Sequence, residues 1–300
     1  MRVLIITCAG MSTRFSKSVG YNCLKCIYSD KDIKQSILYK SIMNNVSYFD
    51  KIIIVGGFKF DDLNKFINKY FEDLKEKIIL VDNKMYAKYG SGYSFWLGLK
   101  QAFDYETSEI VFMEGDLYIN EKEFKKMCEI NNNIVTTNYD EITASKAVAF
   151  YIDLSGKIHY IYDTKHNALQ IDEPFFSIRN SGQIWKFIDI GCLRYICNNL
   201  LEEEKKGTNL VIIQKYFEKL TEKQYIIFNF SKCQYLLLKF LCEFFVKTKK
   251  RGHCPLTLSN GFICSVSWLP SCTHRHTPAL LSPHAKCRVL IQDTSSLQYP

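Results

Sequence analysis

Four short apolar runs alternate with segments of helical periodicity in the first 115 residues. The runs, each of strand length, are residues 3–7, 51–55, 77–81 and 109–113. Between the second and third runs, apolar residues recur at helical spacing behind Asp61 and Asp62, whose carboxylates can cap a first turn. A further helix is expected from Ser94 to Phe103. This alternation predicts an α/β fold with a Rossmann-like, mostly parallel sheet flanked by helices.

The pattern becomes mixed from about residue 134. Residues 146–151 and 157–162 alternate around a turn at residues 153–156, which predicts an antiparallel addition to the sheet. Helical patterns over residues 193–204 and 209–220 and a strand over 224–228 complete the expected domain, residues 1–228.

Residues 229–300 form an atypical C-terminal segment. The last fifty residues hold five of the six prolines, four of the six histidines and a single acid, Asp293, and no periodicity fits them to an element. We expect the segment after about residue 250 to be disordered or non-native and to contribute nothing to the core.

Composition excludes several classes of protein. The net charge of +8 is spread along the chain without a basic block, so we expect no nucleic-acid partner. The longest apolar stretch, residues 235–246, is short and interrupted by Lys239 and Glu243, so we expect no membrane span. The first residues do not resemble a signal peptide, and the twelve cysteines are scattered, which predicts a cytoplasmic protein with reduced thiols.

Candidate phosphate-binding residues follow the first expected strand. The chain reads Cys8-Ala9-Gly10-Met11-Ser12-Thr13-Arg14-Phe15, and Lys25 lies eleven residues after Arg14. Small residues after a strand allow backbone N–H groups to approach a triphosphate, and the two cations can neutralise its oxygens and the charge that develops during transfer. The alternative is an ordinary turn with basic residues nearby by chance.

This stretch resembles the start of the sugar-phosphate and choline-phosphate nucleotidyltransferases, whose first strand leads into A-G-x-G-[ST]-R-[FLM] and then P-K. Ser12 stands where the family has its second glycine, and Leu24 stands where it has proline. The resemblance implies that Ala9, Gly10, Ser12 and Thr13 bind a nucleotide, and that Arg14 and Lys25 are catalytic.

A second stretch resembles the base-recognition loop of the family. Asn83, Gly90, Ser91, Gly92 and Ser94 are its candidate nucleotide-binding residues. The two glycines would let the backbone reach the base edge, and the serines could bond ribose or phosphate at a helix N-terminus. A simple helix cap is the alternative for Ser94.

Carboxylates follow the fourth expected strand. Glu114 and Asp116 would stand at the carboxyl edge of a parallel sheet, where such folds bind ligands. Asp116 matches a metal-binding Asp of the family, often written D-x-D, which implies Mg²⁺ as cofactor. The family has a second metal-binding Asp or Asn after its last strand, where this chain offers Asn229 and no carboxylate.

Residues that could bind the acceptor lie in the second half of the expected domain. Candidate acceptor-binding residues are Lys146, Asp163, Ser181 and Trp185, of which the last two belong to a stretch similar to the family's S-G-x-x-x-W. A solvated strand lysine is the alternative for Lys146.

Together, these motifs predict an enzyme that transfers a nucleoside monophosphate to a small phosphorylated acceptor. The resemblance to the choline-phosphate enzymes implies that the transferred group is CMP from CTP. Phosphocholine, a phosphorylated amino acid or amide, and a sugar phosphate remain open as acceptors, and the product would serve surface polysaccharide biosynthesis. One alternative is a glycosyltransferase that uses Glu114 and Asp116 to hold a sugar nucleotide. Another is a catalytically inactive nucleotide-binding protein, in view of Ser12, Leu24 and the altered C-terminus.

Overall fold

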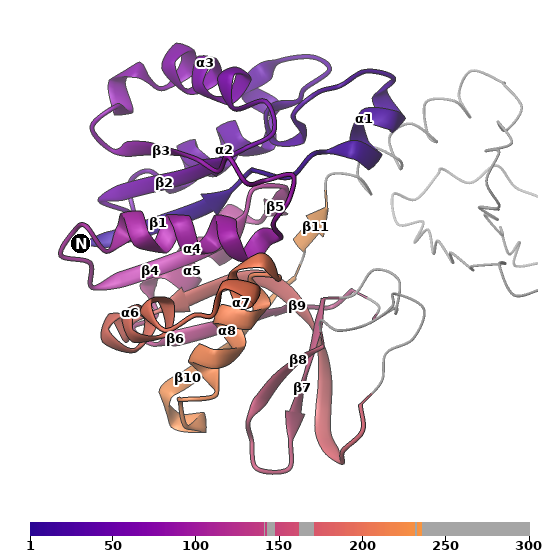
Figure 1. The fold of residues 1–300 in the computed structure, drawn as a ribbon, viewed down its shortest axis with the longest axis vertical. Coiled ribbons are helices and arrows are strands. Elements are labelled where there is room, and N and C mark those ends of the chain that lie inside the picture. The colour runs from indigo at the N-terminus through magenta and orange to yellow at the C-terminus, as the bar shows by residue number, and fades with distance from the viewer. Residues whose placement is uncertain (141, 143–147, 162–170, 232, 236–300) are drawn as a thin grey trace, which may run out of the picture. The chain divides into compact units, whose positions relative to one another are not determined.

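A mixed nine-stranded sheet forms the centre of the described chain (Figure 1). The computed structural model describes residues 1–140, 142, 148–161, 171–231 and 233–235. The main path of the sheet runs β10-β6-β9-β4-β1-β2-β3, with β7 and β8 continuing from β9. Its strands are β1 (Arg2–Thr7), β2 (Lys51–Gly56), β3 (Ile78–Asp82), β4 (Glu109–Glu114), β6 (Asn133–Asn138), β7 (Ala149–Asp153), β8 (Ile158–Ile161), β9 (Phe175–Phe187) and β10 (Tyr225–Phe230). A separate antiparallel pair joins β5 (Leu117–Ile119) to β11 (Cys233–Tyr235).

Helices cover both faces of the sheet, as expected for parallel strands whose residues are apolar on both sides. Side chains of α4, α6 and α8 pack on one face. Side chains of α2, α3 and α5 pack on the other. The helices are α1 (Thr13–Val19), α2 (Ile37–Asn45), α3 (Phe60–Tyr70), α4 (Ser91–Ala102), α5 (Glu121–Glu129), α6 (Ile190–Asn198), α7 (Glu202–Lys206) and α8 (Leu210–Phe217). None of them combines the length and hydrophobicity that crossing a membrane requires, among the residues described.

The first half of the fold follows the sequence pattern closely. The four expected strands are β1 to β4, and β1 pairs in parallel with both β2 and β4. The helix behind Asp61 and Asp62 is α3, which buries Leu63, Phe66 and Ile67. Both aspartates lie inside its first turn, where their negative charges interact favourably with the positive end of the helix dipole. The N-cap residue is Lys59. Our expectation that they cap the helix was therefore wrong.

Several boundaries differ from the expected ones. The helix expected from residue 94 begins at Ser91, so Ser94 lies inside α4 and does not cap it. The helical pattern over residues 193–204 is divided into α6 and α7, because the chain leaves the helix at Asn199. The folded part also extends past residue 228, since β10 ends at Phe230 and β11 reaches Tyr235. Residues 236–300, including the segment expected to be disordered, lie outside the described residues.

The antiparallel addition is confirmed, and a long strand completes it. β7 and β8 pair antiparallel across the expected turn. β9 then pairs with β7 through its first half and inserts its second half between β4 and β6. A register shift marks the change, and Gln183 adopts a positive φ of 56° there. A bulge of this kind bends a strand, so one strand can serve two parts of the sheet.

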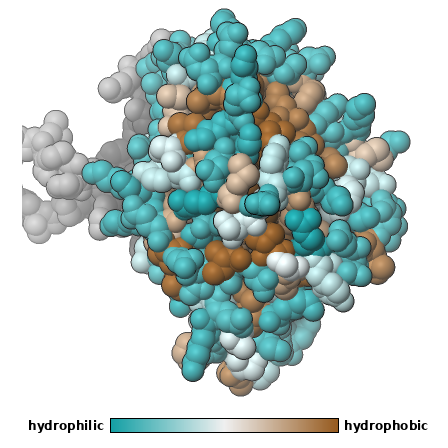
Figure 2. Space-filling model, turned by 90° about the vertical axis from the view of Figure 1, so that its left-hand side faces the viewer, coloured by the Kyte–Doolittle hydropathy of each residue, from teal (hydrophilic) through white to brown (hydrophobic). Residues whose placement is uncertain are grey.

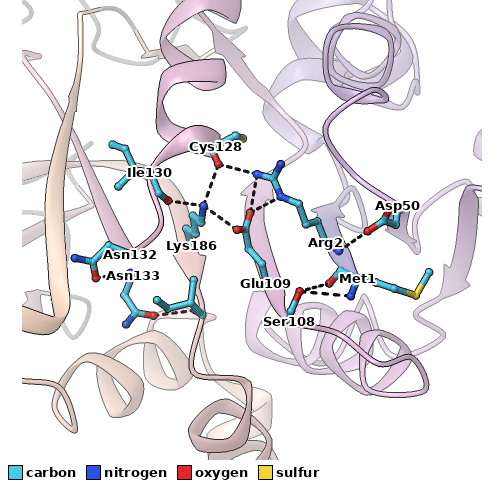
Figure 3. Close-up of polar contacts among 11 residues, drawn as sticks. Met1, Arg2, Asp50, Ser108, Glu109, Cys128, Ile130, Asn132, Asn133 and Lys186 are labelled. Carbon is cyan, nitrogen blue, oxygen red and sulfur yellow. Dashed lines mark hydrogen bonds and ion pairs between the residues drawn. The ribbon is translucent and has the colours of Figure 1, made fainter.

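A buried ion network ties β9 to the amino ends of β4 and β1 (Figure 3). The Lys186 side chain is 1% exposed, and its Nζ lies 2.9 Å from Glu109 Oε2. It also donates to the carbonyls of Cys128 and Ile130. Arg2 donates to Glu109 Oε1 and to the same Cys128 carbonyl. Every charge in the network therefore has a partner, as burial demands.

On this side of the molecule, hydrophilic side chains cover most of the surface and apolar residues show between them (Figure 2).

Candidate active site

A cleft of about 360 Å³ lies at the carboxyl ends of β1 and β4. This is the edge at which open α/β sheets bind ligands, and the volume falls within the range typical of small-molecule sites. Residues from four segments line the cleft: the loop after β1, the stretch around Lys25, the start of α4, and the end of β4. The structure thus brings together three motifs that lie up to about a hundred residues apart in the sequence.

The loop after β1 has the tight course that the phosphate-binding hypothesis needs. Ala9, Gly10, Ser12 and Thr13 all line the cleft, and α1 begins at Thr13. Ser12 adopts a left-handed conformation with a φ of 53°, which glycine reaches without strain. Its side-chain oxygen accepts a hydrogen bond from Lys25 N at 3.2 Å. Serine at the family's glycine position therefore keeps the turn and adds a contact to the next motif.

The two candidate catalytic cations face the same cleft. Arg14 lies on the first turn of α1 and is exposed. The Lys25 side chain is 18% exposed and forms an ion pair with Asp116 Oδ2. Leu24, which replaces the family's proline, is 3% exposed and packs into the core beside Lys25. The leucine thus anchors this stretch by burial of an apolar side chain.

Two carboxylates at the end of β4, Glu114 and Asp116, line the cleft. Asn209 Nδ2 donates to Glu114 Oε1 at 3.0 Å. Burial, and next the negative charge of Asp116, raise the pKa of Glu114 to about 7, although the Asn209 hydrogen bond and Lys25 act in the opposite direction. Asp116 Oδ1 is buried and accepts no hydrogen bond from any described residue. A buried acceptor without a partner, next to a second carboxylate, is a suitable ligand for a hard cation.

The loop before α4 contributes only part of its predicted residues. Gly90, Ser91 and Ser94 line the cleft, whereas Asn83 and Gly92 do not. Asn83 is fully buried, donates to Ser94 Oγ at 2.9 Å and accepts from Met85 N at 2.9 Å. Its amide thus shapes the loop from behind. Of the five residues predicted for this loop, three therefore line the cleft and two do not.

Several lining residues were not singled out from the sequence. Tyr86 and Tyr89 add aromatic surface to the cleft, next to Gly90. Cys8 and Cys26 add apolar surface near Lys25, and a hydrogen bond between the two thiols, together with burial, raises the pKa of Cys8 well above its usual value. The tyrosines lie between Asn83 and Gly90 in the sequence, so the resemblance of this stretch to a base-recognition loop could have indicated them. The cysteine pair becomes visible only when the two loops meet.

The predicted acceptor residues lie elsewhere or outside the described chain. Lys146 and Asp163 are not among the described residues. Ser181 is 1% exposed, and its side-chain oxygen accepts from Gln183 N. Trp185 is fully buried, stacks on Phe112 and donates to Tyr160 Oη at 2.6 Å. Both residues of β9 thus belong to the core, and the stretch similar to S-G-x-x-x-W is a strand and not a pocket wall.

Asn229, the candidate for a second metal ligand, is also committed elsewhere. Its side-chain oxygen accepts a hydrogen bond from Thr137 Oγ1 on the neighbouring strand β6. It does not line the cleft. The described carboxylates at the cleft are therefore Glu114 and Asp116.

Comparison with solved structures defines the class of the fold. The inositol-1-phosphate CTP transferase from T. maritima superimposes with a TM-score of 0.55 at 17% identity, over 78% of this chain and 88% of that chain. The CTP:phosphocholine cytidylyltransferase from Streptococcus pneumoniae gives 0.57 at 15% identity, over 82% and 100%. A UDP-glucose pyrophosphorylase complexed with UDP-glucose gives 0.59 at 12% identity, over 84% and 100%. The chain therefore has the nucleotidyltransferase fold that the N-terminal motif predicted.

The family of the chain is narrower than this fold. Residues 21–235 match the model of a domain of unknown function, DUF6564, and the chain belongs to that family. No curated protein sequence is significantly similar to it.

Proposed function

We propose that the protein is a nucleotidyltransferase that transfers CMP from CTP to a small phosphorylated acceptor and releases pyrophosphate. One observation carries the proposal: a single cleft at the carboxyl edge of the sheet gathers the phosphate loop, Arg14, Lys25 and two carboxylates. The preference for CTP rests on the resemblance of the loop before α4 to the choline-phosphate enzymes. Two of the structural neighbours are a CTP transferase and a cytidylyltransferase.

In this reaction an oxygen of the acceptor phosphate attacks the α-phosphorus, and the bond from that phosphorus to the oxygen that links it to the β-phosphorus breaks. This oxygen leaves with pyrophosphate. The acceptor phosphate is already an anion, so the step requires no general base. Catalysis then depends on positioning and on neutralisation of charge. Arg14 and Lys25 line the cleft and supply the positive charge. The backbone of residues 9–13 supplies N–H donors for the triphosphate.

Asp116 and Glu114 are the residues that would hold Mg²⁺. Among the described residues no three His, Cys, Asp or Glu side chains gather into a complete metal site. A pair of carboxylates suits Mg²⁺, which usually takes one or two carboxylates from the protein and completes its shell with substrate phosphates and water. Mg²⁺ bound there would neutralise the charge of the triphosphate.

The ion pair of Lys25 with Asp116 gives each charge a partner. A triphosphate offers Lys25 anionic oxygens, and a cation offers Asp116 a countercharge. The two side chains then separate to bind different parts of the same substrate complex.

The activity can be tested by a panel of the four NTPs against phosphocholine, a phosphorylated amino acid and a sugar phosphate, with Mg²⁺ or with EDTA. Pyrophosphate release is expected with CTP, and only when an acceptor and Mg²⁺ are both present. Transfer of sugar from a sugar nucleotide, without pyrophosphate release, would identify a glycosyltransferase instead. Binding of CTP without turnover on any acceptor would identify an inactive nucleotide-binding protein.

A further inference from the structure

The segment over residues 206–209, from the last residue of α7 to the start of α8, lies directly against the start of α4. Gly90 N donates to Lys206 O at 2.8 Å, and Gly92 N donates to Gly207 O at 3.0 Å. A Cβ atom at position 90 would lie 2.3 Å from the Gly207 oxygen. These glycines therefore allow close contact between two backbone segments that are more than a hundred residues apart.

Asn209 extends this contact to the carboxylates. The residue is 3% exposed, its backbone N–H donates to Ser91 Oγ at 3.1 Å, and its side-chain amide donates to Glu114 Oε1 at 3.0 Å. Asn209 is the N-cap residue of α8, a position where asparagine normally bonds the first turn of the helix. Its side chain makes no such bond. The amide is directed at Glu114 instead.

This contact has a chemical consequence for the cleft. Glu114 and Asp116 carry like charges in a partly buried position, where they have fewer water molecules to bond. Each carboxylate therefore needs hydrogen-bond donors from the protein. An amide donor on one oxygen fixes the plane of the Glu114 carboxylate. Hydrogen-bonding partners of metal ligands commonly have this role.

We infer that Asn209 is a positioning residue that orients Glu114 toward a cation bound with the triphosphate and fixes the start of α4 relative to the carboxylates. This inference rests on the proposed function, because it assigns the cleft to a nucleotide and its cation. Asn209 acts through Glu114 and Ser91, and it contacts no reacting atom itself.

The test compares Asn209→Ala and Asn209→Ser with wild type in the full chain. Calorimetry measures CTP affinity with Mn²⁺ and with EDTA, and steady-state kinetics separates kcat from KM for the metal–CTP complex. We expect each variant to need roughly 10- to 100-fold more Mn²⁺ to support CTP binding, the usual cost of losing such a partner. CTP affinity in EDTA should stay within about twofold, since the phosphate loop is untouched.

Two features keep the test decisive. Serine is among the best N-cap residues, so Asn209→Ser should fold even if the alanine variant does not. Asn133→Ala is the matched control, because Asn133 is equally buried and bonds Gln224 O and Tyr216 Oη far from the cleft. This control should lower the melting temperature and leave the Mn²⁺ dependence unchanged.

The outcomes separate the inference from the proposed function. Unchanged Mn²⁺ dependence in folded Asn209→Ser would overturn the inference. The variants could lose cation-dependent CTP binding while the wild type releases no pyrophosphate with any acceptor. This result would support the inference and overturn only the proposed activity. Absence of cation-dependent CTP binding in wild type would overturn both.

Discussion

At the scale of single residues, Lys25 and Asp116 stand out because each neutralises the other across the cleft. The two residues are 91 positions apart, and both side chains remain partly accessible, 18% and 30% exposed. An ion pair with this accessibility contributes little to stability, since solvent screens it. Its position at the ligand-binding edge of the sheet therefore favours a role in binding and catalysis.

Lys25→Ala should lower kcat on the order of 10²-fold while weakening CTP binding much less, because an electrostatic stabiliser interacts most strongly with the charge that develops during transfer. Pyrophosphate-release kinetics and CTP titration on the same preparation measure the two effects. Lys17→Ala, which removes an exposed lysine from α1, is the control and should have normal kinetics. Normal turnover of Lys25→Ala would make the N-terminal motif a coincidence.

Asp116→Asn should abolish Mg²⁺-dependent turnover and leave the fold intact, because a strand-end carboxylate with an unpartnered buried oxygen serves a ligand and not the core. Asp82→Asn is the matched control, since Asp82 is an exposed carboxylate at the carboxyl end of β3 and does not line the cleft. Melting curves and turnover together decide the result. An Asp116→Asn protein that unfolds, while its folded fraction keeps the wild-type rate, would show that Asp116 is structural.

At the scale of elements, β9 has two roles that the sequence pattern conceals. Its second half inserts between β4 and β6, and it carries Lys186 into the buried network with Glu109 and Arg2 (Figure 3). Removing one partner of a buried ion pair leaves the other charge unpaired and is strongly destabilising, unless the remaining charge keeps another partner.

Glu109→Gln should therefore destabilise the fold by about 3 kcal/mol or more, because the Lys186 side chain, at 1% exposure, is left with only carbonyl partners. Lys186→Met should cost clearly less, because Glu109 retains Arg2. Urea unfolding of both variants measures the difference. The reverse order would show that the ammonium, and not the carboxylate, stabilises this end of the sheet.

The periodicity of apolar residues predicted β1 to β4, because these strands depend on local pattern. Parallel connectivity predicted that Arg14, Lys25 and Asp116 lie close together, because residues that follow parallel strands meet at one edge of the sheet. The resemblance to a family motif, which was the basis for predicting Trp185, failed. A short match at residues 181–185 carried no information on burial, and a bulge at Gln183 broke the alternation that marks a strand. Asn209 could not be predicted either, because its contact with Glu114 depends on how a connection between two helices folds back onto the sheet.

At the scale of the whole molecule, the described residues of both apolar clusters lie within residues 3–230. Residues 251–300 hold a single acid and no periodicity that fits an element. Removal of residues 251–300 should therefore leave the melting temperature unchanged. At this chain length a loss of even ~1 kcal/mol would shift the midpoint by about 2–4 °C, so thermal unfolding of full-length and shortened chains is sensitive enough. A fall of several degrees would show that the C-terminal segment contributes to the fold.

The central claim is that the cleft breaks CTP at its α-phosphorus. The most direct measurement follows radiolabel from CTP labelled at the α-phosphate or at the γ-phosphate, incubated with Mg²⁺ and the best acceptor. Our account predicts that the α-label moves to the acceptor product and that the γ-label leaves as pyrophosphate. Transfer of the γ-label to the acceptor, or release of the α-label as free CMP regardless of acceptor, would contradict it.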